Sequence, residues 1–543
     1  MNFFDYAYLW LAVYLVFTGF IGVKWIRVAQ REHYVFGWTE RIAAGWGKAR
    51  GLSSWPLIAS VVLAAGVVAL NYYGRLVPLL PLPATALVLG ISALWPWGLG
   101  FRGTTSKMQW TARAKRLAVI WLAVWLVSTI VGLAIFFASL STYFFVGGLF
   151  DSDTNLEWLV GAVLVTALIT PARFAPTSMD IALAIANPIE KALSKKWLIS
   201  AQKKLRQVNP TVVAVTGSYG KTSTKGYIAH LVGAKFAVVP SPASFNNLLG
   251  LARAVNDKLT PGTEVFVAEM GIFGEGEIRR LCESFPPDIA AITVIGEAHL
   301  ERMKTRETIL RAKSEIVENA KTVVLPIDDP DLARLADRCE AEGKRVVRVS
   351  ASGGHADVSV DPDSSIATIA GGTVPVVISG VGHAVNVAVA LGIAHAMGVP
   401  LEQLAARLQS LPTAAHRAEP QQAPSGAIII DDSYNANPLG AARAVEGGAA
   451  MAKERGGEFI VVTPGMIELG KVQAERNRAF AEQIEAAGGS LSIVGYTNRK
   501  ALSKGHSSAK VFANRTDAMS DALQRAGASG VILVENDLPD HYA

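Results

Sequence analysis

The first 172 residues contain apolar segments that are too long and too closely spaced for an ordinary soluble domain. A helix of roughly twenty consecutive apolar residues spans the hydrocarbon core of a bilayer. About five segments of the chain approach or exceed this length, and they run over residues 6–23, 55–73, 76–97, 117–146 and 158–172. The sequence therefore predicts an α-helical membrane domain over residues 1–172, with about five transmembrane helices.

The charges between these segments indicate how the chain crosses the membrane. Residues 24–50 and 102–116 are rich in lysine and arginine, whereas residues 151–157 carry only acidic charges. Short loops rich in basic residues face the cytoplasm. We therefore expect a multi-pass protein of the inner (plasma) membrane, with an external N-terminus and cytoplasmic catalytic domains. Because much of the net charge of +6 lies in these loops, it favours membrane topology over nucleic-acid binding.

Residues 173–209 form a predicted basic amphipathic linker. Within it, "PIEKALSKKWLISAQKKLRQ" (188–207) has apolar residues at helical spacing and many lysines. Two interpretations stay open. The segment is either a solvated linker helix or an amphipathic helix that lies on anionic lipid headgroups.

The rest of the chain alternates short apolar runs with helical stretches. The runs "EVFVAEMG", "IAAITVIG" and "KTVVLPID" are separated in this way, which is typical of a mainly parallel sheet covered by helices. A second series begins near residue 413 with "GAIIIDDSYN" and ends with "GVILVEN". The predicted fold class is therefore an α-helical membrane region followed by two α/β domains. They cover residues 210–412 and 413–543, and the second is small and Rossmann-like.

A glycine-rich stretch, "TGSYGKTST" (216–224), lies between an apolar run and a helical stretch. Only two residues separate Gly217 from the Gly-Lys pair, where the common phosphate-binding loop has four. A strand, loop and helix in this order offer backbone N–H groups and a helix N-terminus to phosphate. We expect Lys221 to neutralise the β- and γ-phosphates of ATP and Thr222 to bind Mg²⁺. The predicted nucleotide-binding residues of the loop are Gly217, Ser218, Tyr219, Gly220, Lys221, Thr222 and Ser223.

Further motifs follow the loop in a fixed order. They are "SFNNLLG" (244–250), "VAEMGIFGEGEI" (267–278), "EAHLERM" with "AKSEI" (297–316), "VGHAVNVAVA" (381–390), "AAHRAE" (414–419), "DDSYNANP" (431–438) and "GMIELG" (465–470). Together with the shortened loop, this series resembles the Mur ligase superfamily. The last two motifs resemble the MurF type, which adds D-alanyl-D-alanine to UDP-N-acetylmuramoyl-tripeptide. "GMIELG" departs from the family pattern, because Pro464 and Gly465 stand where the family has Gly-Asp.

The resemblance implies an ATP-dependent ligase of cell-wall precursor synthesis. In this chemistry the γ-phosphate of ATP converts a carboxylate into an acyl phosphate, which an amine then attacks. By resemblance, Glu269 joins Thr222 at one Mg²⁺, while His299 and Lys313 serve a second. Lys313 would be carbamylated by CO₂, because an ammonium has no lone pair for a cation and a carbamate supplies oxygen ligands. The predicted catalytic residues are Lys221, His299 and Lys313.

The same resemblance assigns binding roles. It places Asn386 at the adenine, Arg417 at a phosphate and Asp432 at the ribose of ATP. His383 stands where the family often has asparagine, which leaves its role open. The predicted substrate-binding residues are Asn246, Asn247, Tyr434, Asn435 and Asn437. For the last three, a turn rich in hydrogen-bonding side chains is the alternative interpretation.

Two kinds of acceptor substrate stay open. Mur ligases ordinarily begin with a soluble domain that holds the UDP end of the substrate, but here the predicted spans and linker lead into the ATP loop. The acceptor is therefore either a small UDP-linked precursor recognised differently or a lipid-linked envelope precursor presented by the bilayer. The amine would come from an amino acid or a dipeptide, and we expect no nucleic-acid partner.

Two other functions compete with this hypothesis. One is a membrane polymer ligase resembling the poly-γ-glutamate synthases, which "SYNANP" disfavours. The other is an ATPase that drives transport, and the near absence of charged residues within the predicted spans disfavours it.

Overall fold

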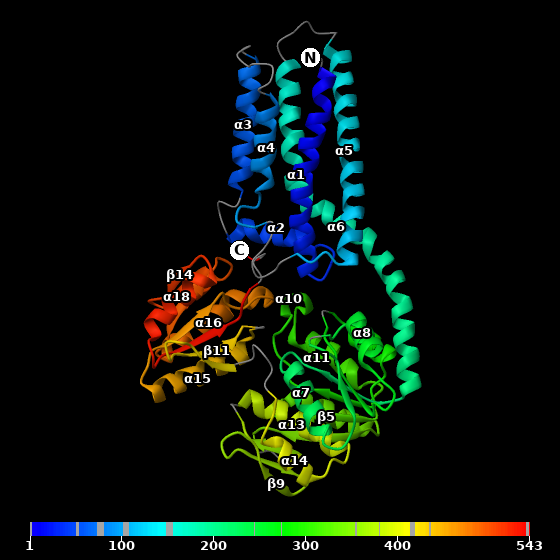
Figure 1. Ribbon diagram of the computed structural model, residues 1–543, viewed down its shortest axis with the longest axis vertical. Coiled ribbons are helices and arrows are strands. Elements are labelled where there is room, and N and C mark those ends of the chain that lie inside the picture. Colours follow the sequence, from blue (N-terminus) through cyan, green and yellow to red (C-terminus); the bar gives the residue numbers. More distant parts are fainter. Residues whose placement is uncertain are drawn as a thin grey trace. The chain divides into compact units, whose positions relative to one another are not determined.

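The chain divides into two compact units. The computed structural model describes residues 3–49, 54–72, 81–100, 108–147, 156–243, 245–272, 274–352, 356–378, 381–412, 419–433, 436–538 and 542. One unit comprises Met1–Leu193 with Leu538–Ala543, and the other comprises Ser194–Asp537. Figure 1 colours the chain from the N-terminal helices to the last strand.

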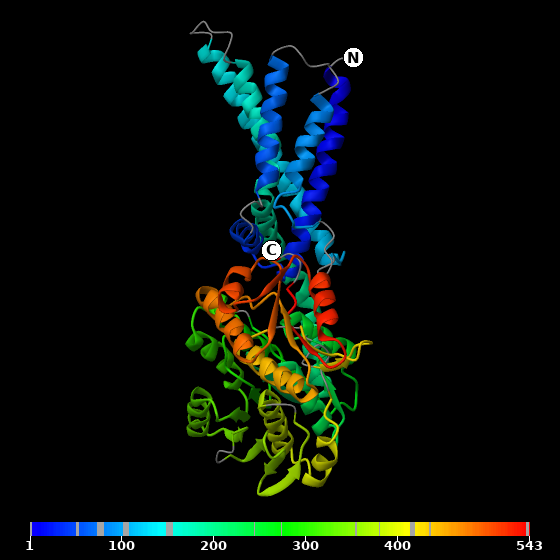
Figure 2. The ribbon, with the colours of Figure 1, turned by 90° about the vertical axis from the view of Figure 1, so that its left-hand side faces the viewer.

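The first unit is helical. Its helices are α1 (Phe3–Arg31), α2 (Trp38–Ala49), α3 (Trp55–Tyr72), α4 (Pro81–Ala93), α5 (Ala112–Gly147) and α6 (Leu156–Val208), the last of which continues into the second unit. Figures 1 and 2 show α1, α3, α4, α5 and the beginning of α6 running along a common direction. Trp25, Trp121, Trp125 and Met179 are buried in one apolar cluster that joins α1, α5 and α6.

Each of the five predicted membrane segments overlaps one of these helices. Helix formation alone does not make a segment membrane-spanning, because a span must also be long and apolar enough. Among the described residues, one stretch, Ala112–Val131 of α5, is long and apolar enough to cross a membrane. The multi-span arrangement therefore stays a prediction. Residues 73–80, 101–107 and 148–155, which hold parts of the predicted spans and loops, lie outside the described residues.

The predicted boundary between the fifth span and the linker at residue 172 does not interrupt the helix. Residues 158–172 and most of the linker, 173–209, belong to the single helix α6. On the later part of α6, Ile181, Ile185, Ile189 and Leu193 are all exposed and follow one another at intervals of four residues. This spacing places them along one side of the helix.

The second unit begins with a nine-stranded sheet in the order β2-β3-β1-β4-β5-β6-β7-β8-β9. The pairs from β2 to β7 are parallel, which confirms the predicted mainly parallel sheet. The antiparallel pairs of β7, β8 and β9 were not predicted. The strands are β1 (Thr211–Thr216), β2 (Val238–Pro240), β3 (Val265–Glu269), β4 (Ile289–Ile292), β5 (Thr322–Pro326), β6 (Arg345–Ser350), β7 (Val358–Asp361), β8 (Ile366–Ile369) and β9 (Gly372–Pro375).

Helices cover both faces of this sheet, because the alternating side chains of its strands are apolar on each face. Val213 and Val215 of β1 pack in the cluster that includes α7 (Lys221–Val232), α13 (Val381–Ala396) and α14 (Leu401–Leu408). Val212 and Ala214 pack in the opposite cluster. Its helices are α8 (Leu248–Lys258), α9 (Glu277–Ser284), α10 (Leu300–Met303), α11 (Arg306–Ser314), η1 (Glu315–Val317) and α12 (Pro330–Ala341).

A six-stranded sheet follows, in the order β10-β11-β15-β12-β13-β14, and it confirms the predicted second α/β domain. Its strands are β10 (Glu419–Gln422), β11 (Ile428–Asp432), β12 (Phe459–Thr463), β13 (Ser490–Val494), β14 (Lys510–Phe512) and β15 (Val531–Glu535). The helices are α15 (Pro438–Arg455), η2 (Gly470–Val472), α16 (Gln473–Ala486), α17 (Arg499–Gly505) and α18 (Arg515–Ala526).

The chain leaves this sheet after β15, and Leu538–Ala543 is grouped with the first unit. The end of the second α/β domain at residue 543 stays a prediction. There the Tyr542 hydroxyl donates a hydrogen bond to Glu32 Oε1 at 3.1 Å.

Candidate functional site

The glycine-rich loop connects the carboxyl end of β1 to the first turn of α7, as predicted. Gly220 has a left-handed backbone (φ 75°), and a Cβ there would lie 2.0 Å from Asn386 Oδ1 of α13. A Cβ on Gly217 would lie 1.9 Å from Thr293 Oγ1. Both positions therefore require glycine. Gly220 gives the N-terminus of α7 no side-chain cap, which suits a helix end that holds a phosphate.

Two lysines converge on one carbonyl of this loop. Lys221 Nζ donates to Gly217 O at 2.6 Å, and Lys313 Nζ of α11 donates to the same oxygen at 3.0 Å. Lys313 is buried, and its burial, together with the positive charge of Lys221, holds its pKa well below the ordinary value. A lowered pKa favours the neutral amine, which is the form that can react with CO₂. The surroundings of Lys313 therefore suit the predicted carbamate.

Glu269, at the carboxyl end of β3, is surrounded by hydrogen-bond donors. Its Oε2 accepts from Thr222 Oγ1 at 3.0 Å and from Lys225 Nζ at 2.9 Å, while its Oε1 accepts from Asn246 Nδ2 at 3.2 Å. Burial alone would raise the pKa of Glu269, but the nearby charges of Lys225 and Lys221 outweigh it and lower the pKa below its usual value. The carboxyl group is therefore ionised beside the Thr222 hydroxyl. These are the hard oxygen ligands that Mg²⁺ prefers.

Sequence reasoning missed Lys225. It lies one helical turn after Lys221 and is buried, and it also donates to Ala243 O. A lysine four residues after the loop lysine, on a helix that packs against a sheet, is a signal that could have been noticed. Its place opposite a buried carboxylate depends on β3, which no local pattern reveals.

His299 meets a residue of the second α/β domain. It follows β4 with a left-handed backbone (φ 62°), and its Nδ1 lies 2.6 Å from Glu468 Oε2. Nearby, Arg476 of α16 forms a two-point ion pair with Glu297, at 2.8 and 2.7 Å. Glu468 belongs to the predicted "GMIELG" motif, but its contact with His299 was not predicted. The two α/β domains are therefore joined beside the predicted metal ligand.

A cavity of about 420 Å³ lies where these two domains meet. The middle domain contributes Tyr219, Gly296 and Glu297, and the second domain contributes Pro438 and Leu439, among others. Its position beside the glycine-rich loop and its mixed apolar and polar lining suit a small organic substrate.

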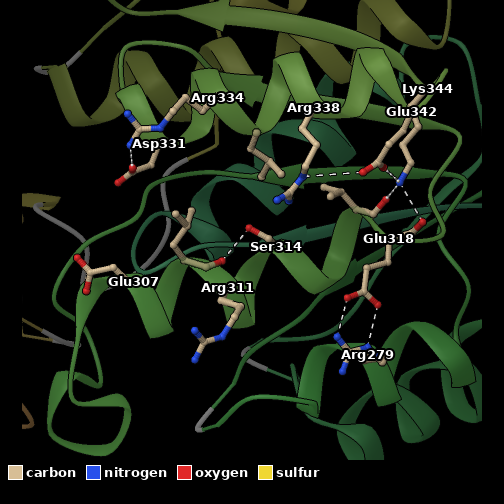
Figure 3. A pocket seen from close by; sticks show the side chains of 13 residues that line it. Arg279, Glu307, Arg311, Ser314, Glu318, Asp331, Arg334, Arg338, Glu342 and Lys344 are labelled. Atoms are coloured by element: carbon tan, nitrogen blue, oxygen red, sulfur yellow. Dashed lines mark hydrogen bonds and ion pairs between the residues drawn. The ribbon is translucent and has the colours of Figure 1, made fainter.

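A larger cavity, of about 790 Å³, lies elsewhere on the middle domain, among α9, α11 and α12 (Figure 3). It contains none of the predicted site residues. Its cations face carboxylates: Arg279 pairs with Glu318 at 2.6 Å, and Lys344 lies 3.3 Å from Glu342. We do not assign it to the reaction.

Several other predicted residues have structural contacts. The Asn247 side chain accepts from Gly250 N at 2.9 Å and caps α8, and the Asn437 side chain accepts from Gly440 N at 2.7 Å and caps α15. The Ser218 hydroxyl accepts from Gly296 N at 2.9 Å. Substrate binding by Asn247 and Asn437 stays a prediction, and capping explains both side chains locally.

Asp432 lies beside a carboxyl group on the neighbouring strand, whereas His383 lies beside an aromatic ring. Asp432 ends β11 and pairs in register with Glu535 of β15. Burial and the charge of Asp432 hold the pKa of Glu535 well above its usual value. The His383 ring centroid lies 5.2 Å from that of Tyr227. Arg417, Tyr434 and Asn435 lie outside the described residues.

No group of three or more histidines, cysteines or acidic residues gathers into a metal site among the described residues. The predicted ligand set is of another kind, because it relies on a hydroxyl, one carboxylate, one histidine and a modified lysine. Thr222 Oγ1 and Glu269 Oε2 lie 3.0 Å apart, and their metal role stays a prediction. Lys313 lies at the loop and His299 at the domain boundary.

A glycine-rich loop between the end of a parallel strand and a helix, with a carboxylate and two lysines beside it, is an arrangement typical of phosphate-binding sites. Residues 215–394 match the family model "Mur ligase middle domain".

Individual ligases are also similar to this chain in sequence or structure. The UDP-N-acetylmuramoyl-tripeptide–D-alanyl-D-alanine ligase of Bacillus subtilis is 32% identical over 282 residues, which are 50% of this chain and 60% of that protein. The ligase of the same name from Mycobacterium tuberculosis is 35% identical over 242 residues, 42% of this chain and 46% of that protein. The crystal structure of MurF from Thermotoga maritima in complex with ADP superposes with a TM-score of 0.55 at 26% identity, covering 63% of this chain and 80% of that one. The chain thus spans about half the length of the curated relatives it matches.

Proposed function

We propose that this protein is a MurF-like, ATP-dependent carbon–nitrogen ligase of cell-wall precursor synthesis. It joins the carboxylate of an envelope precursor to the amine of an amino acid or dipeptide. The observation that carries the proposal is the convergence of Lys221 and Lys313 on Gly217 O, next to the Thr222–Glu269 pair. The relatives named above, which act on UDP-N-acetylmuramoyl-tripeptide and D-alanyl-D-alanine by their names, support this substrate class.

The chain's own residues then take distinct roles. ATP with Mg²⁺ supplies the phosphoryl group that activates the carboxylate. The loop N–H groups and Lys221 would hold the phosphates, while Thr222 and Glu269 would hold one Mg²⁺. His299 and a carbamylated Lys313 would hold a second. The cavity between the two α/β domains, which Tyr219 of the loop lines, would place the acceptor beside the loop.

The remaining predicted residues bind the two substrates. Asn386 reaches the nucleotide from α13, as its place against Gly220 suggests. Arg417 and Asp432 would complete the nucleotide site, and Asn246, which contacts Glu269, would bind the acceptor. A polymer ligase remains the second candidate, because it would use the same ATP chemistry.

The direct test is an assay of the full chain in detergent with ATP, Mg²⁺ and D-alanyl-D-alanine. The acceptor is either UDP-N-acetylmuramoyl-tripeptide or its lipid-linked counterpart, and ADP and the new amide are measured, the latter by mass spectrometry. We expect ADP release only when both acceptor and amine are present. ADP release without either would favour a transport ATPase, and repeated addition of the amine would favour the polymer ligase.

We further propose that the first unit lies in the inner membrane and brings the site to a lipid-linked acceptor. Large apolar side chains of α5 are exposed within the stretch Ala112–Val131, among them Val119, Val127 and Ile130. Exposed apolar residues on a long apolar helix suit contact with lipid. An acceptor confined to the same surface would gain effective concentration.

Topology reporters test this proposal. A reporter fused after Arg116 or after Gln207 is expected to give a cytoplasmic signal, and one inserted near Asp153 an external signal. The physical reason is the excess of basic residues in the first two long loops. An external signal at Gln207 would separate the glycine-rich loop from ATP and contradict both the topology and the proposed reaction.

A further inference from the structure

The His299 side chain is held by a carboxylate from the other α/β domain. His299 Nδ1 lies 2.6 Å from Glu468 Oε2, and both side chains are about one-fifth exposed, at 22% and 23%. An ionised carboxylate can only accept, so the Nδ1 atom carries the hydrogen and donates it. This contact fixes both the tautomer and the orientation of the imidazole ring.

The Glu468 backbone is tied to the same short segment. Its carbonyl oxygen accepts from Glu301 N at 2.8 Å, and its Oε1 lies 3.7 Å from Arg302 Nη2. Glu468 has a left-handed backbone (φ 63°), and a Cβ added to Gly470 would lie 3.1 Å from Glu301 Cα. The main chain and the side chain of Glu468 therefore both contact the segment around His299. The approach is so close that Gly470 has little room for a side chain.

We propose that Glu468 is a positioning residue that orients His299 toward the second Mg²⁺. The inference rests on the proposed function and deepens it. Histidines that bind metals typically donate their other ring N–H to a carboxylate or carbonyl, which sets the tautomer and raises the basicity of the ligating nitrogen. Since Nδ1 is given to Glu468, the metal ion would be held through Nε2.

The origin of Glu468 has a consequence for the reaction cycle. His299 and Lys313 belong to the middle domain, whereas Glu468 follows β12 of the second domain. The second metal site therefore reaches its full affinity only when the two domains are together. By linkage, Mg²⁺ at this site favours the closed arrangement to the same extent.

The test is a titration of the full chain in detergent with Mn²⁺ in place of Mg²⁺, in the presence of a non-hydrolysable ATP analogue. Free Mn²⁺ is followed by electron paramagnetic resonance. Wild type is expected to bind two Mn²⁺. Glu468→Ala should weaken one of them by about 10- to 100-fold and leave the other, at Thr222 and Glu269, unchanged. Glu468→Gln keeps an acceptor oxygen without the charge, so its effect should be smaller.

Arg478→Met is the matched control, because it removes an exposed ion pair with Glu482 within the same helix α16 and touches neither His299 nor the middle domain. It should leave both Mn²⁺ affinities as in wild type. Wild-type Mn²⁺ affinity in Glu468→Ala would overturn the inference, and so would an equal loss in Arg478→Met. If Glu468→Ala does not fold, the Glu468→Gln titration decides. A wild type that forms the amide while Glu468→Ala binds Mn²⁺ normally would refute this inference alone, whereas a wild type that forms no amide would refute the proposed function.

Discussion

Replacement of Lys313 by alanine is expected to lower the rate of amide formation by about 10³-fold or more, since a lost metal ligand removes several kcal/mol of transition-state stabilisation. Lys313 is buried, and its Nζ contacts the loop carbonyl of Gly217 at 3.0 Å. A carbamate there would supply oxygen ligands, and alanine removes this ligand and leaves the space it filled empty. The measurement is steady-state ADP release and amide formation by the full chain.

Rescue distinguishes a carbamate from a lysine that acts by its positive charge. Formate, acetate or propionate should partly restore the activity of Lys313→Ala, because each can place a carboxylate where the carbamate stood. Lys221→Ala should lose activity to a similar extent without rescue, since its role is cationic. Unchanged turnover of Lys313→Ala would rule out the carbamate assignment, and equal rescue of both variants would show that the added acids act elsewhere.

Replacement of Lys225 by methionine is expected to lower the free energy of unfolding of the α/β unit by about 3 kcal/mol. Lys225 and Glu269 form a buried pair with side chains 6% and 2% exposed, and their atoms lie 2.9 Å apart. Methionine carries no charge, so the buried Glu269 carboxylate would lose the positive charge that pairs with it. The double variant Lys225→Met with Glu269→Gln should recover most of the loss, because no uncompensated charge remains. Denaturant unfolding at pH 7 measures both, and Lys235→Met, which removes an exposed lysine of the same domain, is the control.

The pH dependence of this loss has a defined sign. The pKa of Glu269 in the folded protein is below its ordinary value of 4.5, so its ionised form stabilises the fold at higher pH. The difference between wild type and Lys225→Met should therefore be full at neutral pH. It should shrink as the pH falls below 4.5 and through the folded-state pKa, where Glu269 becomes protonated in both proteins. A difference that stays constant down to the acid limit would mean that lost packing, and not charge, causes the effect.

Some of the site could be predicted from local sequence alone. The apolar run over β1, the glycines at 217 and 220 and the helical spacing after Lys221 together specify strand, loop and helix. The loop glycines are needed because neighbouring side chains approach too closely for a Cβ. The role of Lys313 could not be reached in this way, because a lysine on "RAKSEI" has the spacing of an exposed helix face. Its assignment depended on the resemblance.

The sequence by itself determined those features whose causes lie within a few neighbouring residues: the apolar segments, the order of strands and helices, the phosphate-binding loop and the helix caps at Asn247 and Asn437. The tertiary structure alone decided the contacts between distant segments. Lys313 lies 96 residues from Gly217, Lys225 lies 44 residues from Glu269, and Glu468 lies 169 residues from His299. The physical reason is that periodicity and turn geometry act along the chain. The burial that lowers the pKa of Lys313, and the carboxylate that orients His299, arise only when sheets and domains pack together.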